Sequence, residues 1–161
     1  MSTSLTSLPH RDPVLFAGIV ATVVLGSAFA FQLAGYPPCD LCWWQRYPYM
    51  GIMAISLIGT ALKSLPRKLI LVLLALLFLT DAGIAGFHFG VEQRWWEGLA
   101  TCSSYVDITD NVNDALKSIM DAPLIRCDEI AWSLFGISMA GYNFLIALGM
   151  TVFCVKKATN A

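Results

Sequence analysis

Residues 38–46 read PCDLCWWQR and lie between two long apolar runs. They place two cysteines three positions apart, then two tryptophans, and then an arginine four residues past the second cysteine. A dithiol at this spacing closes a small, strained disulfide that is suited to exchange with other thiols. Because apolar runs end and begin on either side of it, the stretch predicts a redox-active dithiol at the surface of a membrane.

The composition also indicates a membrane protein. Of the 161 residues, 57% are hydrophobic and only 13% are charged, whereas an ordinary soluble domain carries about 25% charged residues. The formal net charge is −1, and the sequence contains neither a basic cluster nor a glycine-rich phosphate-binding motif. We therefore expect one integral-membrane domain over residues 1–161 and no binding of nucleic acid.

Four apolar segments are long enough to cross a bilayer, which takes about 20 helical residues. The predicted spans are residues 14–34, 44–62, 69–90 and 134–155, with Pro48 in the first turn of the second span. Residues 28–30 resemble a signal-peptide cleavage site, but this apolar run is longer than a usual signal core and its basic flank is thin. The expected fold is an all-α membrane protein, a four-helix antiparallel transmembrane bundle.

Positive charges orient this predicted bundle, because short cytoplasmic flanks are enriched in lysine and arginine. The N-terminal segment, the turn at 63–68 and the C-terminal end hold six basic residues within short flanks, so we expect both termini in the cytoplasm and the loops 35–43 and 91–133 outside. This orientation gathers six aromatic residues at the outer interface, as in an aromatic belt: Trp43, Trp44, Tyr47, Trp95, Trp96 and Trp132.

The long outer loop, residues 91–133, contains a segment with helical periodicity. Apolar residues between 108 and 120 recur at helical spacing, and acidic residues occupy the other face. The pattern predicts a short interfacial helix on the membrane surface. A helix packed on the loop's own residues is the alternative.

The five cysteines divide by the predicted side of the membrane. Cys39, Cys42, Cys102 and Cys127 lie outside, where disulfides persist, and Cys154 lies at the cytoplasmic end of the fourth span, where we expect inert packing. Four cysteines allow three pairings, and the small loop favours Cys39 with Cys42. Both pairs being structural is the alternative. A zinc site of four cysteines is disfavoured because Cys102 and Cys127 are far apart in sequence, so we expect no metal.

At this point the chain resembles the disulfide-bond-formation protein B (DsbB) family of bacterial inner-membrane enzymes. The resemblance rests on the four spans, the Cys-x-x-Cys pair followed by Gln45-Arg46, the second-loop cysteines, the stretch GFHFGVEQ at 86–93, and CDE at 127–129 with Trp132 before the last span. It implies a quinone-dependent thiol oxidase that uses ubiquinone or menaquinone. Such an enzyme reoxidises a periplasmic dithiol oxidase of the DsbA type and so supports disulfide bond formation.

The resemblance also implies roles for the four outer cysteines. Cys102 and Cys127 would form the disulfide that accepts electrons from the partner, with Cys102 making the mixed disulfide. The electrons would pass to a second disulfide, Cys39–Cys42, and then to the quinone, with Cys42 as the thiolate nearest the quinone.

Elementary chemistry supports the assignment of Cys42 and Arg46. Cys42 is expected just before a helix, whose unpaired N–H groups and dipole favour a thiolate. Arg46 lies one turn later on the same face. Together they would lower the thiol pKa by about one unit or more, each unit being about 1.4 kcal/mol, and the guanidinium can also bond a quinone carbonyl. The alternative is that Arg46 anchors the helix by snorkelling to lipid headgroups.

Other residues are weaker candidates. Trp43 and Trp44 would either stack on the quinone or, as we favour, belong to the aromatic belt. His88 is a further candidate for the quinone site. The sequence does not decide whether His88, Glu92 or Gln93 has this role. Asp81 shares a helix face with His88 and would relay protons to the quinone; the favoured alternative is a bond between Asp81 and a polar group on another helix, such as Asn143.

Two other functions compete with quinone-dependent thiol oxidation. A vitamin K epoxide reductase-like enzyme has the same chemistry, but its Cys-x-x-Cys comes late in the chain instead of before the second span. A non-enzymatic membrane module with structural disulfides would carry the same cysteines without exchanging them.

Overall fold

The computed structural model of the protein describes residues 12–62, 64–99 and 126–160. Within them lie four helices, α2 (Pro13–Leu33), α3 (Asp40–Ala61), α4 (Arg67–Glu92) and α6 (Met139–Thr159). Two short strands, β1 (Ser133–Leu134) and β2 (Ile137–Ser138), form an antiparallel hairpin before α6. Cys102 and the predicted interfacial helix lie outside the described residues.

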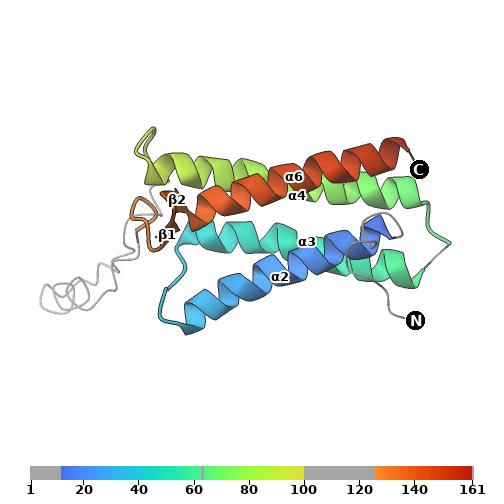
Figure 1. The fold of residues 1–161 in the computed structure, drawn as a ribbon, viewed down its shortest axis with the longest axis horizontal. Helices are drawn as coiled ribbons and strands as arrows, with labels where there is room; N and C mark the ends of the chain where they lie inside the picture. Colours follow the sequence, from blue (N-terminus) through green and yellow to red (C-terminus); the bar gives the residue numbers. More distant parts are fainter. Residues whose placement is uncertain (1–11, 63, 100–125, 161) are drawn as a thin grey trace, which may run out of the picture.

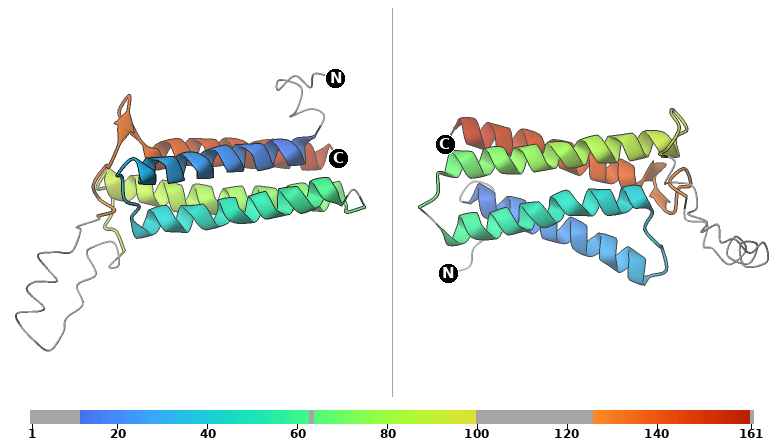
Figure 2. Two further views of the ribbon diagram at one scale, coloured as in Figure 1. Left: turned by 90° about the horizontal axis from the view of Figure 1, so that it is seen from below. Right: turned by 180° about the vertical axis from the view of Figure 1, so that it is seen from behind.

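The helices run alternately up and down in one bundle, as Figure 1 shows. α3 packs against both α2 and α4, and the most extensive helix contact is between α4 and α6. α2 contacts α6 only sparsely and slants away from it toward the end where α3 begins (Figures 1 and 2). The bundle is therefore tightly packed at the end where α2 starts and more open at the opposite end.

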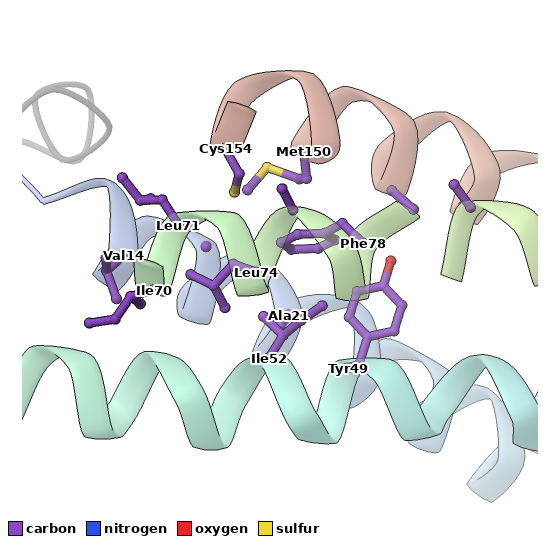
Figure 3. Packing of buried hydrophobic residues seen from close by; sticks show 14 of the residues in the cluster. Val14, Ala21, Tyr49, Ile52, Ile70, Leu71, Leu74, Phe78, Met150 and Cys154 are labelled. Atoms are coloured by element: carbon purple, nitrogen blue, oxygen red, sulfur yellow. The ribbon is translucent and has the colours of Figure 1, made fainter. Parts of the chain in front are cut away.

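An apolar cluster fills the middle of the bundle with residues from all four helices (Figure 3). Phe78 and Leu74 of α4 are fully buried there against Ile52 of α3. Cys154 of α6 is also fully buried in this cluster, beside Met150. Its position agrees with the predicted role as a packing thiol.

Three of the helices, α2, α4 and α6, are long and apolar enough to cross a membrane. α3 is not among them, because its first two turns carry polar and charged side chains, including Asp40, Gln45 and Arg46. The four predicted helices are thus confirmed as helices in the described chain. The membrane crossing of α3 stays a prediction.

The start of α3 differs from the prediction. The helix begins at Asp40 instead of residue 44, and Cys39 is its N-cap, with its sulfur accepting a bond from the backbone N–H of Cys42 at 3.3 Å. The expectation that Cys42 precedes the helix was therefore wrong: Cys42 lies in the first turn. Pro48 accordingly lies in the helix interior. Hydrophobic periodicity missed this start because a polar first turn, with Asp40 favoured by the helix dipole, carries no apolar signal.

The fourth predicted span, residues 134–155, is displaced along the chain, since α6 runs from Met139 to Thr159. Residues 133–138 form the hairpin instead, so the structure is not entirely helical. Phe135 and Gly136 have positive φ angles of 50° and 80°, as a two-residue hairpin turn requires. Ser138 then caps α6 by accepting a bond from the N–H of Gly141.

The first and third predicted spans agree closely with α2 and α4, which extend past them by one to two residues at some ends. Residues 28–30, the possible cleavage site, lie inside α2. There the carbonyl of Ala28 and the ring of Phe29 both contact Arg46 of α3. The segment is therefore part of the packed bundle.

Close contact between α2 and α3 depends on Gly18. A Cβ atom at this position would lie 2.8 Å from Cβ of the buried Ser56, whereas at Gly26, on the same helix, it would meet no atom within 4 Å.

We expect Gly18→Val to lower the free energy of unfolding by about 1–3 kcal/mol relative to Gly26→Val, because overpacking forces the two helices apart. Thermal unfolding of the two purified, detergent-solubilised variants, followed by tryptophan fluorescence, measures this difference. Because both variants make the same chemical change within one helix, equal melting temperatures would contradict the α2–α3 packing.

Candidate redox site

Three of the four predicted redox cysteines lie together at the N-terminal end of α3. Cys39 and Cys42 are present as thiols, with their sulfur atoms 3.0 Å apart. Cys127 belongs to the same buried cluster as Cys39, Leu41 and Val91. The tertiary structure thus brings the second-loop cysteine to the Cys-x-x-Cys pair across 88 positions of sequence, counted from Cys39 to Cys127.

The two thiols of the pair have different surroundings. Cys39 is buried, and Cys42 is half-buried. Hydrogen bonding to Cys127 and to Cys42, together with burial, holds the pKa of the Cys39 thiol well above its usual range. Cys39 is therefore the sulfur that keeps its proton and donates it toward the sulfur of Cys42.

Arg46 is buried, which disfavours the alternative that it anchors the helix to lipid headgroups. Its guanidinium lies between the rings of Phe29 and Trp43, 4.6 and 4.5 Å from their centroids, at cation–π distance. Nη1 donates to Oε1 of Gln32 at 2.6 Å and Nη2 to the carbonyl of Ala28 at 3.4 Å. Among the described residues, Nε has no partner, which leaves one buried donor for another molecule.

His88 of α4 contacts the dithiol, and its Nε2 atom lies 3.6 Å from the sulfur of Cys39. Its other ring nitrogen, Nδ1, is 2.8 Å from Nε2 of Gln45. Glu92, one turn after His88, places Oε1 3.8 Å from the Nε2 atom of His88 and accepts a hydrogen bond from Ser138, the cap of α6. The end of α4 is therefore joined to both the dithiol and α6.

Asn143 of α6 extends the polar contacts into the bundle. Its Nδ2 donates to Oε1 of Gln45 at 2.8 Å and to Oδ2 of Asp81 at 3.0 Å. Its Oδ1 accepts from the hydroxyl of Tyr49 at 2.5 Å. The predicted bond between Asp81 and Asn143 is therefore confirmed, and it connects Asp81 to His88 through Gln45. The proton relay along these residues stays a prediction.

A cavity of about 530 Å³ lies beside the dithiol, where α2 slants away from α6. Its polar side is formed by Cys42, Arg46, His88 and Asn143, among others. Its apolar wall comes from α2, the 36–38 segment, the 130–134 segment and α6, and includes Leu25, Phe31, Tyr36, Trp132 and Ile146.

Trp43 and Trp44, the two tryptophans considered for stacking on a quinone, are not part of this cavity wall. Trp43 instead packs its ring on the Arg46 guanidinium, and Trp44 is half exposed on the outside of α3. With Tyr47, Trp95, Trp96 and Trp132 they lie at the same end of the bundle, as the aromatic belt requires. This placement favours the belt interpretation for Trp44 and a supporting role for Trp43.

Among the residues that the structure describes, one group of side chains could hold a metal ion, and it lies at the dithiol. The sulfur atoms of Cys39 and Cys42 and a ring nitrogen of His88 all lie within 4.8 Å of one another, a spacing that a thiophilic cation can bridge. Nearby Arg46 opposes the binding of a cation there, since its guanidinium is electrostatically coupled to both sulfurs. The expectation of no metal stays a prediction.

Gln45, Asn143 and Ser138 are the site residues that sequence reasoning missed or undervalued. Gln45 was noted only as part of a motif, although it lies one turn after Leu41 and Cys42 and so shares their helix face. Asn143 is an uncharged polar residue within an apolar run, which in a membrane helix signals an interhelical bond. Ser138 carried no signal, because its role depends on where α6 begins.

Comparison with known proteins agrees with this site. The model of the family "Disulfide bond formation protein DsbB" matches residues 10–156. Disulfide bond formation protein B of Marinobacter nauticus is 31% identical over 152 residues, covering 83% of this chain and 86% of that protein. The protein of the same name from Saccharophagus degradans is 27% identical over 158 residues, covering 95% and 94%. An uncharacterised protein of Rickettsia prowazekii is 28% identical over 137 residues, covering 83% and 79%. No solved structure matches the chain significantly.

The family match spans the clustered cysteines, the buried arginine and the helices of the described chain, except for the last three residues of α6. It favours the first predicted function over the vitamin K epoxide reductase-like alternative. With three helices apolar enough to cross a membrane, the chain belongs to the DsbB family of membrane disulfide bond formation proteins.

Proposed function

We propose that the protein reoxidises a periplasmic DsbA-like dithiol oxidase and passes the electrons to a membrane quinone, ubiquinone or menaquinone. The observation that carries this proposal is the contact of one cavity with both the Cys39–Cys42 dithiol and a buried arginine. The dithiol can give up two electrons only if an acceptor reaches it, and the cavity provides that access.

The cavity fits a quinone ring and the start of its apolar tail. Its wall is mainly apolar, as a ring and an isoprenoid tail require. The Nε donor of Arg46 is buried without a partner among the described residues, and a buried donor is costly unless something accepts from it. A quinone carbonyl is such an acceptor. When bound, the quinone would act as an oxidant that accepts two electrons and two protons. Arg46 and the apolar wall would hold it in the cavity.

The arrangement of the sulfur atoms favours one order of exchange. The partner's dithiol would reduce a Cys102–Cys127 disulfide and leave Cys127 as a thiolate. Because Cys127 packs on Cys39, its thiolate would attack the Cys39 sulfur. A Cys39–Cys127 bond then forms as the Cys39–Cys42 bond breaks, and the electron pair stays on Cys42. The electrostatic interaction of Arg46 with Cys42 is stronger than its interaction with Cys39. Arg46 would therefore stabilise the negative charge that this step places on Cys42.

The same chemistry needs a defined orientation in the inner membrane. The start of α2 and the end of α6 lie at one end of the bundle, and the dithiol lies at the other (Figure 1). Arg67, Lys68, Lys156 and Lys157 belong to the first end, which supports a cytoplasmic location for both termini. The cysteines would then face the oxidising periplasm. α3 has 22 residues, about 33 Å of helix, so it is long enough to be the fourth span.

The proposed activity is tested by mixing the purified protein with a reduced thioredoxin-fold dithiol oxidase and a soluble ubiquinone analogue. We expect thiols to disappear in proportion to quinone reduced, and we expect no loss of thiols with the Cys39→Ser/Cys42→Ser variant. Thiol loss that continues without quinone, or in that variant, would exclude quinone-dependent oxidation. A menaquinone analogue in a parallel reaction identifies the preferred acceptor.

Removing Arg46 is expected to weaken quinone use. Arg46→Ala should raise the quinone KM about tenfold or more, because a hydrogen bond from a charged donor contributes about 1.5–3 kcal/mol. Quinone titrations in steady-state assays measure the change. Arg67→Ala is the matched control, since Arg67 is exposed at the opposite end and paired with Asp12. An unchanged KM in Arg46→Ala would rule out the role of the guanidinium.

The proposed exchange also predicts which sulfurs can be trapped. In the Cys42→Ser/Cys102→Ser variant, a mild oxidant such as diamide should join Cys39 to Cys127, because the two residues share one buried cluster. Non-reducing peptide mass spectrometry detects the linked peptides. The control Cys39→Ser/Cys102→Ser should link Cys42 to Cys127 much more slowly. Equal rates in the two variants would argue against attack on Cys39.

A further inference from the structure

Hydrogen bonds connect the middle of the bundle to the dithiol in an unbroken series. Asn143 donates to Gln45, Gln45 contacts His88, and His88 lies against Cys39. Cys39 in turn donates to Cys42. The residues come from α6, α3, α4 and the N-terminal cap of α3, so the series depends on how three helices pack. The quinone and partner chemistry proposed above does not by itself give Gln45 or Asn143 a role.

The direction of the series is set at Gln45. Its Nε2 atom donates to the backbone carbonyl of Leu41 at 3.1 Å, and a carbonyl can only accept, so this end of the amide is the nitrogen. Its Oε1 atom accepts from Asn143, which agrees with the same orientation. The second N–H of Gln45 then meets Nδ1 of His88 at 2.8 Å. Nδ1 must therefore accept and cannot carry a proton.

The tautomer of His88 follows from this contact. A neutral imidazole has one protonated nitrogen, so with Nδ1 accepting, the proton is on Nε2. An imidazolium is excluded, because two N–H groups would face each other between Gln45 and His88. Nε2 lies 3.6 Å from the sulfur of Cys39. The backbone of Cys127 also accepts a hydrogen bond from this ring, so the Nε2–H is shared between that acceptor and the sulfur. His88 is therefore a donor toward the dithiol and not a base that removes its proton.

The direction continues through the dithiol. A lone pair of the Cys39 sulfur receives the N–H of His88, and a second receives the backbone N–H of Cys42. The one hydrogen of Cys39 is then available to the sulfur of Cys42, 3.0 Å away, with the sulfur of Cys127 as a competing acceptor. Cys42 is the last acceptor in the series, and Arg46, four residues later in α3, interacts with it electrostatically.

We propose that Gln45 is a positioning residue that fixes His88 as the Nε2–H tautomer, so that the Cys39–Cys42 dithiol donates in one direction and its negative charge rests on Cys42. The inference deepens the proposed function, on which its purpose rests: the charged sulfur is the one beside the cavity. Asn143 holds the Gln45 amide in its orientation from α6.

Other groups also act on the dithiol. Cys127 is a second sulfur acceptor for the hydrogen of Cys39, so it is removed in the test below. Titratable and charged groups from three parts of the chain face Cys42. They come from α3 and its cap, from α4 and from the 126–132 segment, and they are Cys39, Arg46, His88, Glu92 and Cys127. Arg126 and Glu129 lie farther along the cavity wall.

The tautomer is tested directly by ¹⁵N NMR of histidine-labelled, reduced full-length protein. The chain has two histidines, so a His10→Gln background leaves His88 alone. We expect a protonated Nε2 and an unprotonated Nδ1 at neutral pH. In Gln45→Glu the carboxylate accepts instead of donating, and the proton should move to Nδ1. A wild-type ring with Nδ1–H, or a Gln45→Glu ring unchanged from wild type, would overturn the proposal.

The consequence for the dithiol is tested by the pH dependence of iodoacetamide alkylation. A Cys102→Ala/Cys127→Ala/Cys154→Ala protein retains only the pair, of which Cys42 is the more exposed thiol. We expect Gln45→Glu to shift the midpoint for alkylation of Cys42 upward by about one pH unit, which is about tenfold slower alkylation below the midpoint. Gln45→Met is the uncharged comparison, because it removes the amide without adding a charge.

Gln45→Met adds no charge and removes the amide, so its midpoint should also rise. A midpoint that rises in Gln45→Glu but not in Gln45→Met would show a simple charge effect and overturn the proposal. The samples for the NMR and alkylation measurements contain neither quinone nor partner protein. Failure here therefore leaves the proposed function standing, and failure of quinone-dependent thiol loss leaves these results unaffected.

Discussion

The side-chain amide of Asn143 joins three helices inside an otherwise apolar bundle. It bonds Gln45 and Tyr49 on α3 and Asp81 on α4 while itself belonging to α6. A buried polar group costs free energy unless it is paired, so these four side chains can stay inside only if the helices keep one register. The same register sets the contact between Gln45 and His88. The geometry of the dithiol thus depends on a contact at Gln45, three residues after Cys42 in α3.

Arg46 imposes a second condition on the bundle. A buried guanidinium must be compensated, and here the compensation comes from α2, through Gln32, the Ala28 carbonyl and the Phe29 ring. The slanted end of α2 therefore does two things: it holds the arginine and it forms one wall of the cavity. The charge is kept near Cys42 without a carboxylate partner among the described residues that would cancel it.

Several features were predictable from local sequence. The apolar runs indicated the four helices, and the Cys-x-x-Cys with its arginine indicated a redox site. Local patterns were less informative at helix ends, because capping by Cys39 and Ser138 depends on one hydrogen bond each and not on periodicity. The hairpin before α6 was missed for a similar reason, since residues 133–138 include apolar side chains that extend the apparent span.

The sequence by itself determined the helical class, the family resemblance and the choice of candidate redox thiols, because these follow from hydrophobic periodicity and from residue types at short spacing. Only the tertiary structure decided which groups surround those thiols. Cys127 meets Cys39, and His88 meets Gln45, through packing between segments far apart in the chain. Burial, the direction of a hydrogen bond and the shape of a cavity are properties of several helices at once, so no local pattern encodes them.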